Sequence, residues 1–303
     1  MEKSNCLLSR RQFVQALTMA AAATAVPRAE AAGGFKAAWL NHYTYVAPDL
    51  KKTRDWYHEV FGMQIGHEEA KLSHMWYGDK GDTLMIVRQA QAGEQAPRIE
   101  KFGFTIDNFN RRDVEAELKR RGLQAKSDTD KGFWFTDPEG NEIGVFAKDF
   151  VKRPAPSNEK PFLWKALSAN HIVVTTPDYK KLGVWYKDLL NLRETSDAGR
   201  DVYQWFGTSV WIPTAVREGA KPSSALKSLD HVAYTIANYK NPEVAAELKR
   251  RKMIAENANT EGSLGINCVD INNFKTQVCD IALVTDGEKR RAQPSQPGQR
   301  RPE

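Results

Sequence analysis

The chain has 303 residues, of which 41% are hydrophobic and 27% charged, and this composition suits two globular domains that each have a core. The net charge is +6 at pH 7, but residues 1–32 and 285–303 each carry two of these charges. The central region therefore lacks the clustered basic surface typical of nucleic-acid binding. No run of 18 apolar residues is present, so no stable membrane-spanning helix is expected.

The first 32 residues predict an export signal. Arg10 and Arg11 precede a mildly apolar run at 13–26, and the small residues at 29–31 offer a cleavage site. The arginine pair before this run resembles the twin-arginine (Tat) signal of bacteria. We expect recognition by the Tat export machinery and a periplasmic or secreted location. The alternative is that this segment begins a helix of the mature protein.

The central region of the chain is repeated. Residues 41–63 recur as residues 170–192, with eight of 23 positions identical at an offset of 129. Residues 102–125 recur as residues 232–255, with 11 of 24 positions identical at an offset of 130. Two collinear matches at nearly the same spacing indicate a tandem duplication, with one domain at residues 33–150 and the other at residues 165–284.

Each domain opens with a predicted strand, followed by a helix that begins near a Pro-Asp pair. Both helices contain a Trp-Tyr pair, which we assign to the contact between helix and sheet. Alternating polar and apolar residues then predict further strands. The expected strands are at residues 38–46, 74–79, 83–89, 168–175, 202–206 and 209–213.

The same pattern restarts inside each domain. In the first domain it predicts a strand at residues 102–106 and a helix at residues 112–121, followed by Gly122 as a left-handed cap. Each domain therefore comprises two βαβββ units. Three prolines in residues 151–164 predict a linker between the domains. Residues 285–303 predict a disordered basic tail, which would be the binding segment if this were an interaction protein.

The sequence resembles the vicinal oxygen chelate (VOC) superfamily, which includes glyoxalase I, extradiol dioxygenases and bleomycin resistance proteins. The resemblance rests on the Asn-His pair opening each domain, the Trp-Tyr pairs and the turn from Asp137 to Asn141. It covers residues 35–150 and 165–283. It implies an α+β fold of two tandem VOC domains, each a curled mixed β-sheet with helices outside. It also implies a divalent metal that binds vicinal oxygens of a small-molecule substrate.

The resemblance also implies where metal ligands lie. The family uses His, His and Glu, and the second domain has His171, His231 and Gln277 at these places. Two imidazoles and one amide oxygen suit Fe, Mn, Zn or Ni. The corresponding residues of the first domain are His42, Lys101 and Gly144. One ligand of three cannot hold a metal against water, so the first site is expected to be degenerate.

Gln277 leaves the function open between two classes. An amide lowers metal affinity, lacks the carboxylate of an Fe(II) dioxygenase site and cannot accept a proton as a base. A metal-dependent enzyme of glyoxalase or dioxygenase type is favoured because both histidines are retained. The alternative is a metal-free small-molecule binding protein of the bleomycin-resistance type. In that case the histidines would be ordinary strand residues, and Gln277 would hydrogen-bond a neighbour.

Cys268 and Cys279 remain after removal of the signal, and in an oxidising compartment they could form a disulfide. A turn centred near Asn272 predicts that Cys268 faces Thr276 instead. We therefore favour two buried free thiols, with Cys279 on the same strand face as Gln277. Trp205 and Trp211 are candidates for the wall of an aromatic-binding cavity or for the core.

Overall fold

The computed structural model describes residues 34–78, 83–150, 161–197, 199, 201–206, 214–218 and 229–283. The expected export signal, most of the linker, the basic tail and the strand expected at residues 209–213 lie outside these residues. So do Trp211 and the side chain of Trp205. None of the helices among the described residues is long and apolar enough to cross a membrane.

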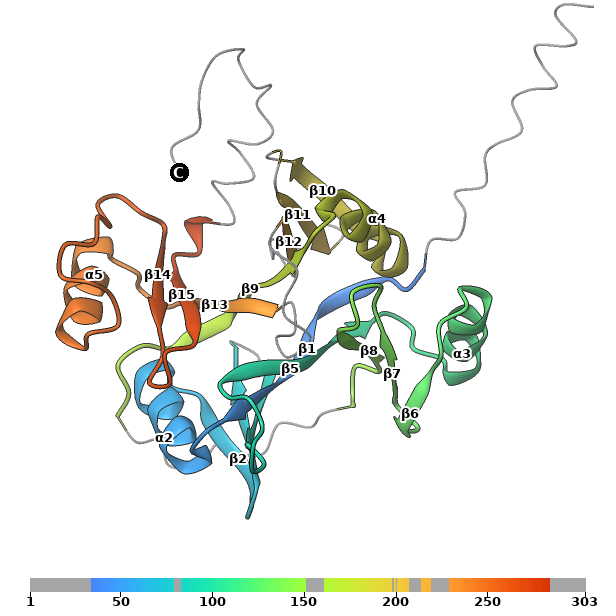
Figure 1. The fold of residues 1–303 in the computed structure, drawn as a ribbon, viewed down its shortest axis with the longest axis horizontal. Helices are drawn as coiled ribbons and strands as arrows, with labels where there is room; N and C mark the ends of the chain where they lie inside the picture. Colours follow the sequence, from blue (N-terminus) through green and yellow to red (C-terminus); the bar gives the residue numbers. More distant parts are fainter. Residues whose placement is uncertain are drawn as a thin grey trace, which may run out of the picture. The chain divides into compact units, whose positions relative to one another are not determined.

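The first half of the chain forms a mixed sheet, called sheet A (Figure 1). Its strands are β1 (Ala37–Ala47), β2 (Gln64–Glu69), β3 (Leu72–Tyr77), β4 (Thr83–Gln89), β5 (Arg98–Ile106), β6 (Lys126–Thr129), β7 (Gly132–Thr136) and β8 (Glu142–Phe146). Their order across the sheet is β2-β3-β4-β1-β5-β8-β7-β6. Helices α2 (Leu50–Phe61) and α3 (Arg111–Arg120) follow the two central strands, β1 and β5, along the chain.

The second half forms sheet B, in which the strand order is β10-β11-β12-β9-β13-β15-β14. Its strands are β9 (Ala166–Thr176), β10 (Leu192–Asp197), β11 (Asp201–Phe206), β12 (Thr214–Glu218), β13 (Leu229–Ile236), β14 (Gly265–Val269) and β15 (Lys275–Cys279). Helices α4 (Tyr179–Leu190) and α5 (Asn241–Arg250) follow β9 and β13. The mixed α+β class and the expected strands within the described residues are confirmed.

Local sequence explains where the helices begin and end. The side chains of Asp49 and Asp178 accept hydrogen bonds from backbone amides in the first turns of α2 and α4, so both are N-caps rather than first-turn residues. Gly62 and Asn191 follow these helices with φ of 62° and 50°. Gly122 has φ of 69°, which confirms the expected left-handed residue after α3.

The last unit departs from the expected βαβββ pattern. After α5, residues 251–264 form turns, whereas the equivalent segment of the first half contains β6. The side-chain amide of Asn241 donates to the carbonyls of Thr260 and Ser263, at 2.7 and 2.8 Å, and holds this segment against the start of α5. The expectation of three strands after each helix is therefore wrong for this unit among the described residues.

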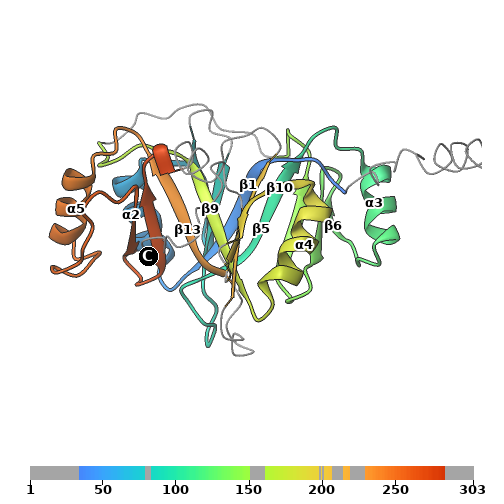
Figure 2. The same ribbon diagram turned by 90° about the horizontal axis from the view of Figure 1, so that it is seen from above.

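Sheets A and B share one hydrophobic core. Tyr43 from β1 and Tyr234 from β13 form a hydrogen bond between their hydroxyls at 2.8 Å. The rings of Tyr57 and Phe61 in α2 lie 6.1 and 4.7 Å from the ring of Tyr234. The described residues from Gly34 to Leu283 consequently belong to one compact unit. Figure 2 shows β1 and β5 beside β9 and β13 from a second direction.

Contacts between the halves occur in pairs formed by equivalent residues of the two repeats. The amide of Phe35 donates to the carbonyl of Leu189, and the amide of Trp164 donates to the carbonyl of Val60. In the same way, the hydroxyl of Tyr186 donates to Asp137 at 2.8 Å and that of Tyr57 donates to Asp270 at 3.0 Å. Both tyrosines are fully buried. The Trp-Tyr pairs therefore contribute to the contact between the halves as well as to the helix-sheet contact.

The turn before the last strand has the same design in both halves. Asp137 accepts hydrogen bonds from the amides of Glu139 and Asn141, and Asp270 accepts them from the amides of Asn272 and Phe274. Gly140 has φ of 86° and Asn273, at the equivalent position, has φ of 61°. Asparagine tolerates this left-handed conformation, so the turn survives in the second half without the Pro and Gly residues.

Candidate functional site

His171 and His231 lie on neighbouring strands of sheet B. In the antiparallel pairing of β9 and β13, His171 is opposite Ala233 and His231 is opposite Val173. The two imidazole rings are 5.4 Å apart between centroids, at an angle of 73°. Both side chains are buried. Their neighbours Ile172 and Val232 belong to the core cluster on the opposite face of the sheet, which we call the core face; the other is the histidine face.

Hydrogen bonds orient both imidazoles in the same way. Nδ1 of His171 lies 2.7 Å from Oδ1 of Asn170, whose Nδ2 donates to Oγ1 of Thr235. Nδ1 of His231 lies 2.8 Å from Oδ2 of Asp230. Both partners of the rings are acceptor oxygens, so each Nδ1 carries the hydrogen. In the neutral imidazole, Nε2 is then the nitrogen with the lone pair, as metal coordination requires.

Nε2 of His231 is buried and has no hydrogen-bond partner in the described structure. A buried nitrogen without a partner destabilises a fold by about 1–3 kcal/mol. A ligand at this pair of adjacent histidines would supply the missing partner. The arrangement therefore fits a divalent metal held by Nε2 atoms.

Gln277 lies on the same face, one strand further along the sheet. In the parallel pairing of β13 and β15 it is opposite Ala233, the residue that also faces His171. Its Oε1 accepts a hydrogen bond from Sγ of Cys279 at 3.4 Å, which confirms that the two residues share a strand face. An amide oxygen has two lone pairs, so Oε1 retains one for a metal.

The candidate ligand set lacks a third ionisable side chain. Across the part of the chain that the structure describes, no group of three His, Cys, Asp or Glu residues could hold a metal. The set His171, His231 and Gln277 would therefore bind metal through two nitrogens and a neutral oxygen. Asp230 provides the nearest negative charge in the hydrogen-bonded group, and Lys275 forms an ion pair with it at 2.8 Å.

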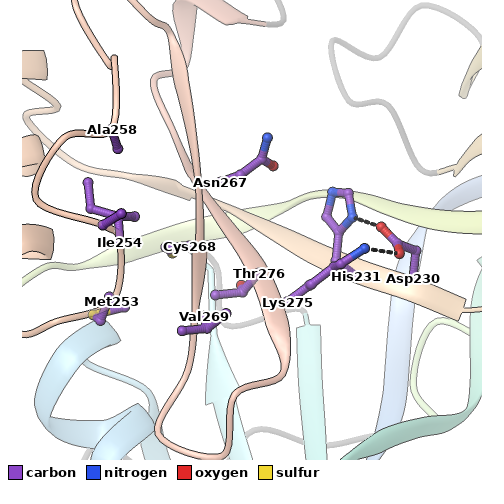
Figure 3. Close-up of a pocket in the computed structure, with 11 residues that line it drawn as sticks. Asp230, His231, Met253, Ile254, Ala258, Asn267, Cys268, Val269, Lys275 and Thr276 are labelled. Carbon is purple, nitrogen blue, oxygen red and sulfur yellow. Dashed lines mark hydrogen bonds and ion pairs between the residues drawn. The ribbon is translucent and has the colours of Figure 1, made fainter.

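A pocket of about 420 Å³ lies beside this face and includes His231 in its lining. Figure 3 shows Met253, Ile254 and Ala258 on one side of the β14–β15 hairpin and the ring of His231 on the other. The pocket does not include His171 or Gln277. We therefore locate the candidate metal site on the histidine face and regard the pocket as a neighbouring feature.

The first half has one buried histidine where the second has two. The ring of His42 is surrounded by three aromatic rings, with centroid distances of 5.1, 4.8 and 5.5 Å to Trp134, Phe146 and Phe150. Burial, and then the positive charge of Lys101, lower the pKa of His42 to about 3. Lys101 lies over the ring of Trp134 and pairs with Glu142. In the first half, aromatic rings and the ammonium group of Lys101 thus surround His42 in place of further metal ligands.

Phe146 fills the space in which a metal would lie in the first half. A Cβ added to Gly103, Gly132 or Gly144 would come closer than 3.0 Å to the ring of Phe146. At the register positions of Trp134 and Phe146, sheet B has Asn267 and Cys279. The sequence contains the signal for this difference, because three glycines surround a phenylalanine in sheet A only. The residues alone did not indicate that the ring covers all three glycines.

The cysteine register agrees with the expectation. Cys268 is opposite Thr276 in the β14–β15 hairpin, and both Cys268 and Cys279 are buried free thiols. Burial raises the pKa of both thiols. They are therefore protonated at neutral pH, and Cys279 can donate its hydrogen to Gln277.

Comparison with known proteins identifies proteins that are similar to this chain in sequence. Residues 39–145 match the model of the Glyoxalase/Bleomycin resistance protein/Dioxygenase superfamily. Glutathione transferase FosA of Serratia marcescens is 25% identical over 130 residues, which are 41% of this chain and 90% of that protein.

Solved structures share the fold over most of the chain. A Mn(II)-bound glyoxalase from Novosphingobium aromaticivorans has a TM-score of 0.63 and 19% identity, and the match covers 82% of this chain and 83% of that chain. The 2,3-dioxygenase LapB from Pseudomonas sp. KL28 has a TM-score of 0.62 and 15% identity, with 81% and 93% covered. At these identities, the two structures show a common fold.

Proposed function

The chain contains a domain of the Glyoxalase/Bleomycin resistance protein/Dioxygenase superfamily, and from this premise we propose that it is an exported protein of two tandem VOC domains. It binds a divalent metal in its second domain and acts on a small molecule with vicinal oxygens, as an enzyme of glyoxalase or dioxygenase type. The buried Nε2 of His231, next to the ring of His171, carries this proposal.

In this proposal His171 and His231 bind the metal through Nε2 and Gln277 binds it through Oε1. The metal supplies Lewis-acid polarisation of the substrate oxygens. Asn170 and Asp230 accept the Nδ1 hydrogens and so leave the Nε2 atoms as the nitrogens that would bind the ion. Gln277 cannot accept a proton, so an isomerisation would need a base outside this set.

A second candidate function is metal-free binding of a small molecule, of the bleomycin-resistance type. It is supported by Gln277, whose Oε1 already accepts a hydrogen bond from Cys279. It is also supported by the missing carboxylate ligand, because a neutral oxygen binds a divalent ion more weakly than a charged one. In this function Nε2 of the paired imidazoles would accept hydrogen bonds from hydroxyl groups of the ligand.

Metal content distinguishes the two functions. Protein purified without chelator is analysed for Fe, Mn, Zn and Ni per chain, together with His171→Ala, His231→Ala and His42→Ala. We expect loss of metal in the first two variants. His42→Ala is the matched control, because His42 occupies the equivalent position of the first half and is enclosed by aromatic rings. Equal metal content in all four proteins would exclude the metal-dependent function.

The export proposal has its own test. A double variant with Arg10→Lys and Arg11→Lys keeps the charge of the N-terminal segment but removes the arginine pair that Tat recognition requires. In bacterial cells we expect the wild-type protein in the periplasmic fraction and the variant in the cytoplasm. Equal amounts of both proteins in the periplasm would contradict Tat export.

A further inference from the structure

The two imidazoles of the candidate site have different partners. His171 is held by the neutral amide of Asn170, which is fully buried, and His231 by the carboxylate of Asp230. Both oxygens of this carboxylate accept hydrogen bonds, because Oδ1 also accepts one from Nζ of Lys275 (Figure 3).

Gln277 and Asp230 together indicate that the negative charge lies beside the ligand set and not within it. The ligand set contains no carboxylate, and Asp230 places one on the far side of the His231 ring. We infer that Asp230 replaces the missing ligand charge by acting through His231, and that Lys275 partly neutralises it. This inference rests on the proposed function and makes Asp230 and Lys275 positioning residues for the metal. A carboxylate that accepts the hydrogen of a ligand imidazole increases the basicity of the ligand nitrogen.

A purely structural role does not account well for this group. The side chain of Lys275 is 69% exposed and that of Asp230 is 20% exposed, and exposed ion pairs contribute little to stability. Nδ1 of His231 could be satisfied by an amide, as Asn170 satisfies His171. The carboxylate therefore adds a negative charge, which attracts a divalent cation.

The first half provides a comparison within the same chain. Lys101 stands at the position of His231, and Glu142, which is opposite Lys101 in the β5–β8 pairing, carries the negative charge. Their charged atoms are 3.3 Å apart. A cation thus stands at the position of the metal ligand, and Glu100, the carboxylate at the position of Asp230, pairs with Arg88 and not with an imidazole. At the positions equivalent to the candidate site, a carboxylate is linked to an imidazole in the second half, whereas Nδ1 of His42 in the first half lies 2.7 Å from the amide oxygen of Asn41. The His67–Glu69 contact of the first half lies on β2, away from these positions.

The test measures the affinity of the chain for Mn(II) alone, with the free ion counted by electron paramagnetic resonance. Asp230→Asn keeps the shape and an acceptor for Nδ1 of His231, and gives His231 the same kind of partner as His171. We expect 10- to 100-fold weaker binding, about the loss observed when outer-shell partners are changed. Lys275→Met should bind about 3- to 5-fold more tightly, because it removes a positive charge near a divalent cation.

The opposite signs of the two effects are decisive. If the ion pair only holds His231 in place, breaking it from either side weakens binding, so weaker binding by Lys275→Met would overturn the inference. Wild-type affinity in Asp230→Asn, with binding lost in His231→Ala, would also overturn it while leaving the proposed function intact. No Mn(II) binding by the wild-type chain, and none of Ni(II) in a parallel titration, would remove both. Thermal unfolding of the metal-free variants controls for changes in folding.

Discussion

The aromatic filling of the first half predicts a large difference between two equivalent glycines. Gly132 is opposite Phe146 in sheet A, and Gly265 is opposite Cys279 in sheet B. A Cβ at position 132 would lie closer than 3.0 Å to two ring carbons of Phe146, whereas a Cβ at position 265 would lie 3.0 Å from the end of the Gln277 side chain. Gly132→Ala should therefore be much more destabilising than Gly265→Ala.

The packing around Phe146 sets the size of the effect. The ring is 1% exposed, and the rings of Trp134, His42 and Phe150 lie 4.9, 4.8 and 4.4 Å from it. It cannot move aside, so Gly132→Ala should cost about 2–3 kcal/mol, the upper part of the range for overpacking. Gly265→Ala should change stability by less than about 1 kcal/mol, because the long Gln277 side chain can shift.

Thermal or urea unfolding measures this difference. At about 2–4 °C per kcal/mol, Gly132→Ala should lower Tm by roughly 4–12 °C, and a second substitution, Phe146→Leu, should recover part of the loss. The coupling free energy in this double-mutant cycle should be about 1–2 kcal/mol. Similar Tm values for Gly132→Ala and Gly265→Ala, or additive effects in the cycle, would refute the conclusion that Phe146 fills this face.

Two further predictions concern buried polar groups. Tyr186→Phe removes a hydroxyl that donates to Asp137 and should destabilise the protein by about 1–3 kcal/mol in urea unfolding. Tyr57→Phe should cost less, because the bond from Tyr57 to Asp270 is longer, at 3.0 Å against 2.8 Å. An equal or larger loss in Tyr57→Phe would contradict this. The pKa of His42 is lowered to about 3 in the folded protein. The unfolded chain therefore binds a proton at this histidine near pH 6.5, whereas the folded chain does not. The folded state consequently loses stability as pH falls from about 6.5 toward 3. His42→Gln should reduce that slope, and an unchanged slope would show that His42 is not the cause.

Much of the local structure follows from local sequence. The strands near residues 38–46, 83–89 and 168–175, the left-handed Gly122 and the pairing of Cys268 with Thr276 were predicted, whereas β2, β10 and β12 were not. These features depend on periodicity, caps and turns, which act over a few residues. The strand missing after α5 was not predicted, because it depends on hydrogen bonds from Asn241 to a segment about 20 residues away.

The candidate site was predicted in part. The sequence indicated His171, His231 and Gln277, and the structure places these residues on neighbouring strands and one face of sheet B. The partners of the imidazoles were not predicted. Asp230 and Asn170 precede the histidines directly in the chain, but nothing in the sequence shows that their side chains turn back to the rings. Side-chain direction depends on the bulges and cross-strand neighbours of the folded sheet.

The amino-acid sequence by itself determined the repeat, the elements of each half and the residue types available at each candidate site. Only the tertiary structure decided that side chains fill this face of sheet A but not the equivalent face of sheet B. In sheet A the ring of Phe146 lies over glycines from three strands, and in sheet B Nε2 of His231 is buried without a partner within the described residues. The reason is that packing volume and hydrogen-bond satisfaction are properties of atoms brought together from distant parts of the chain.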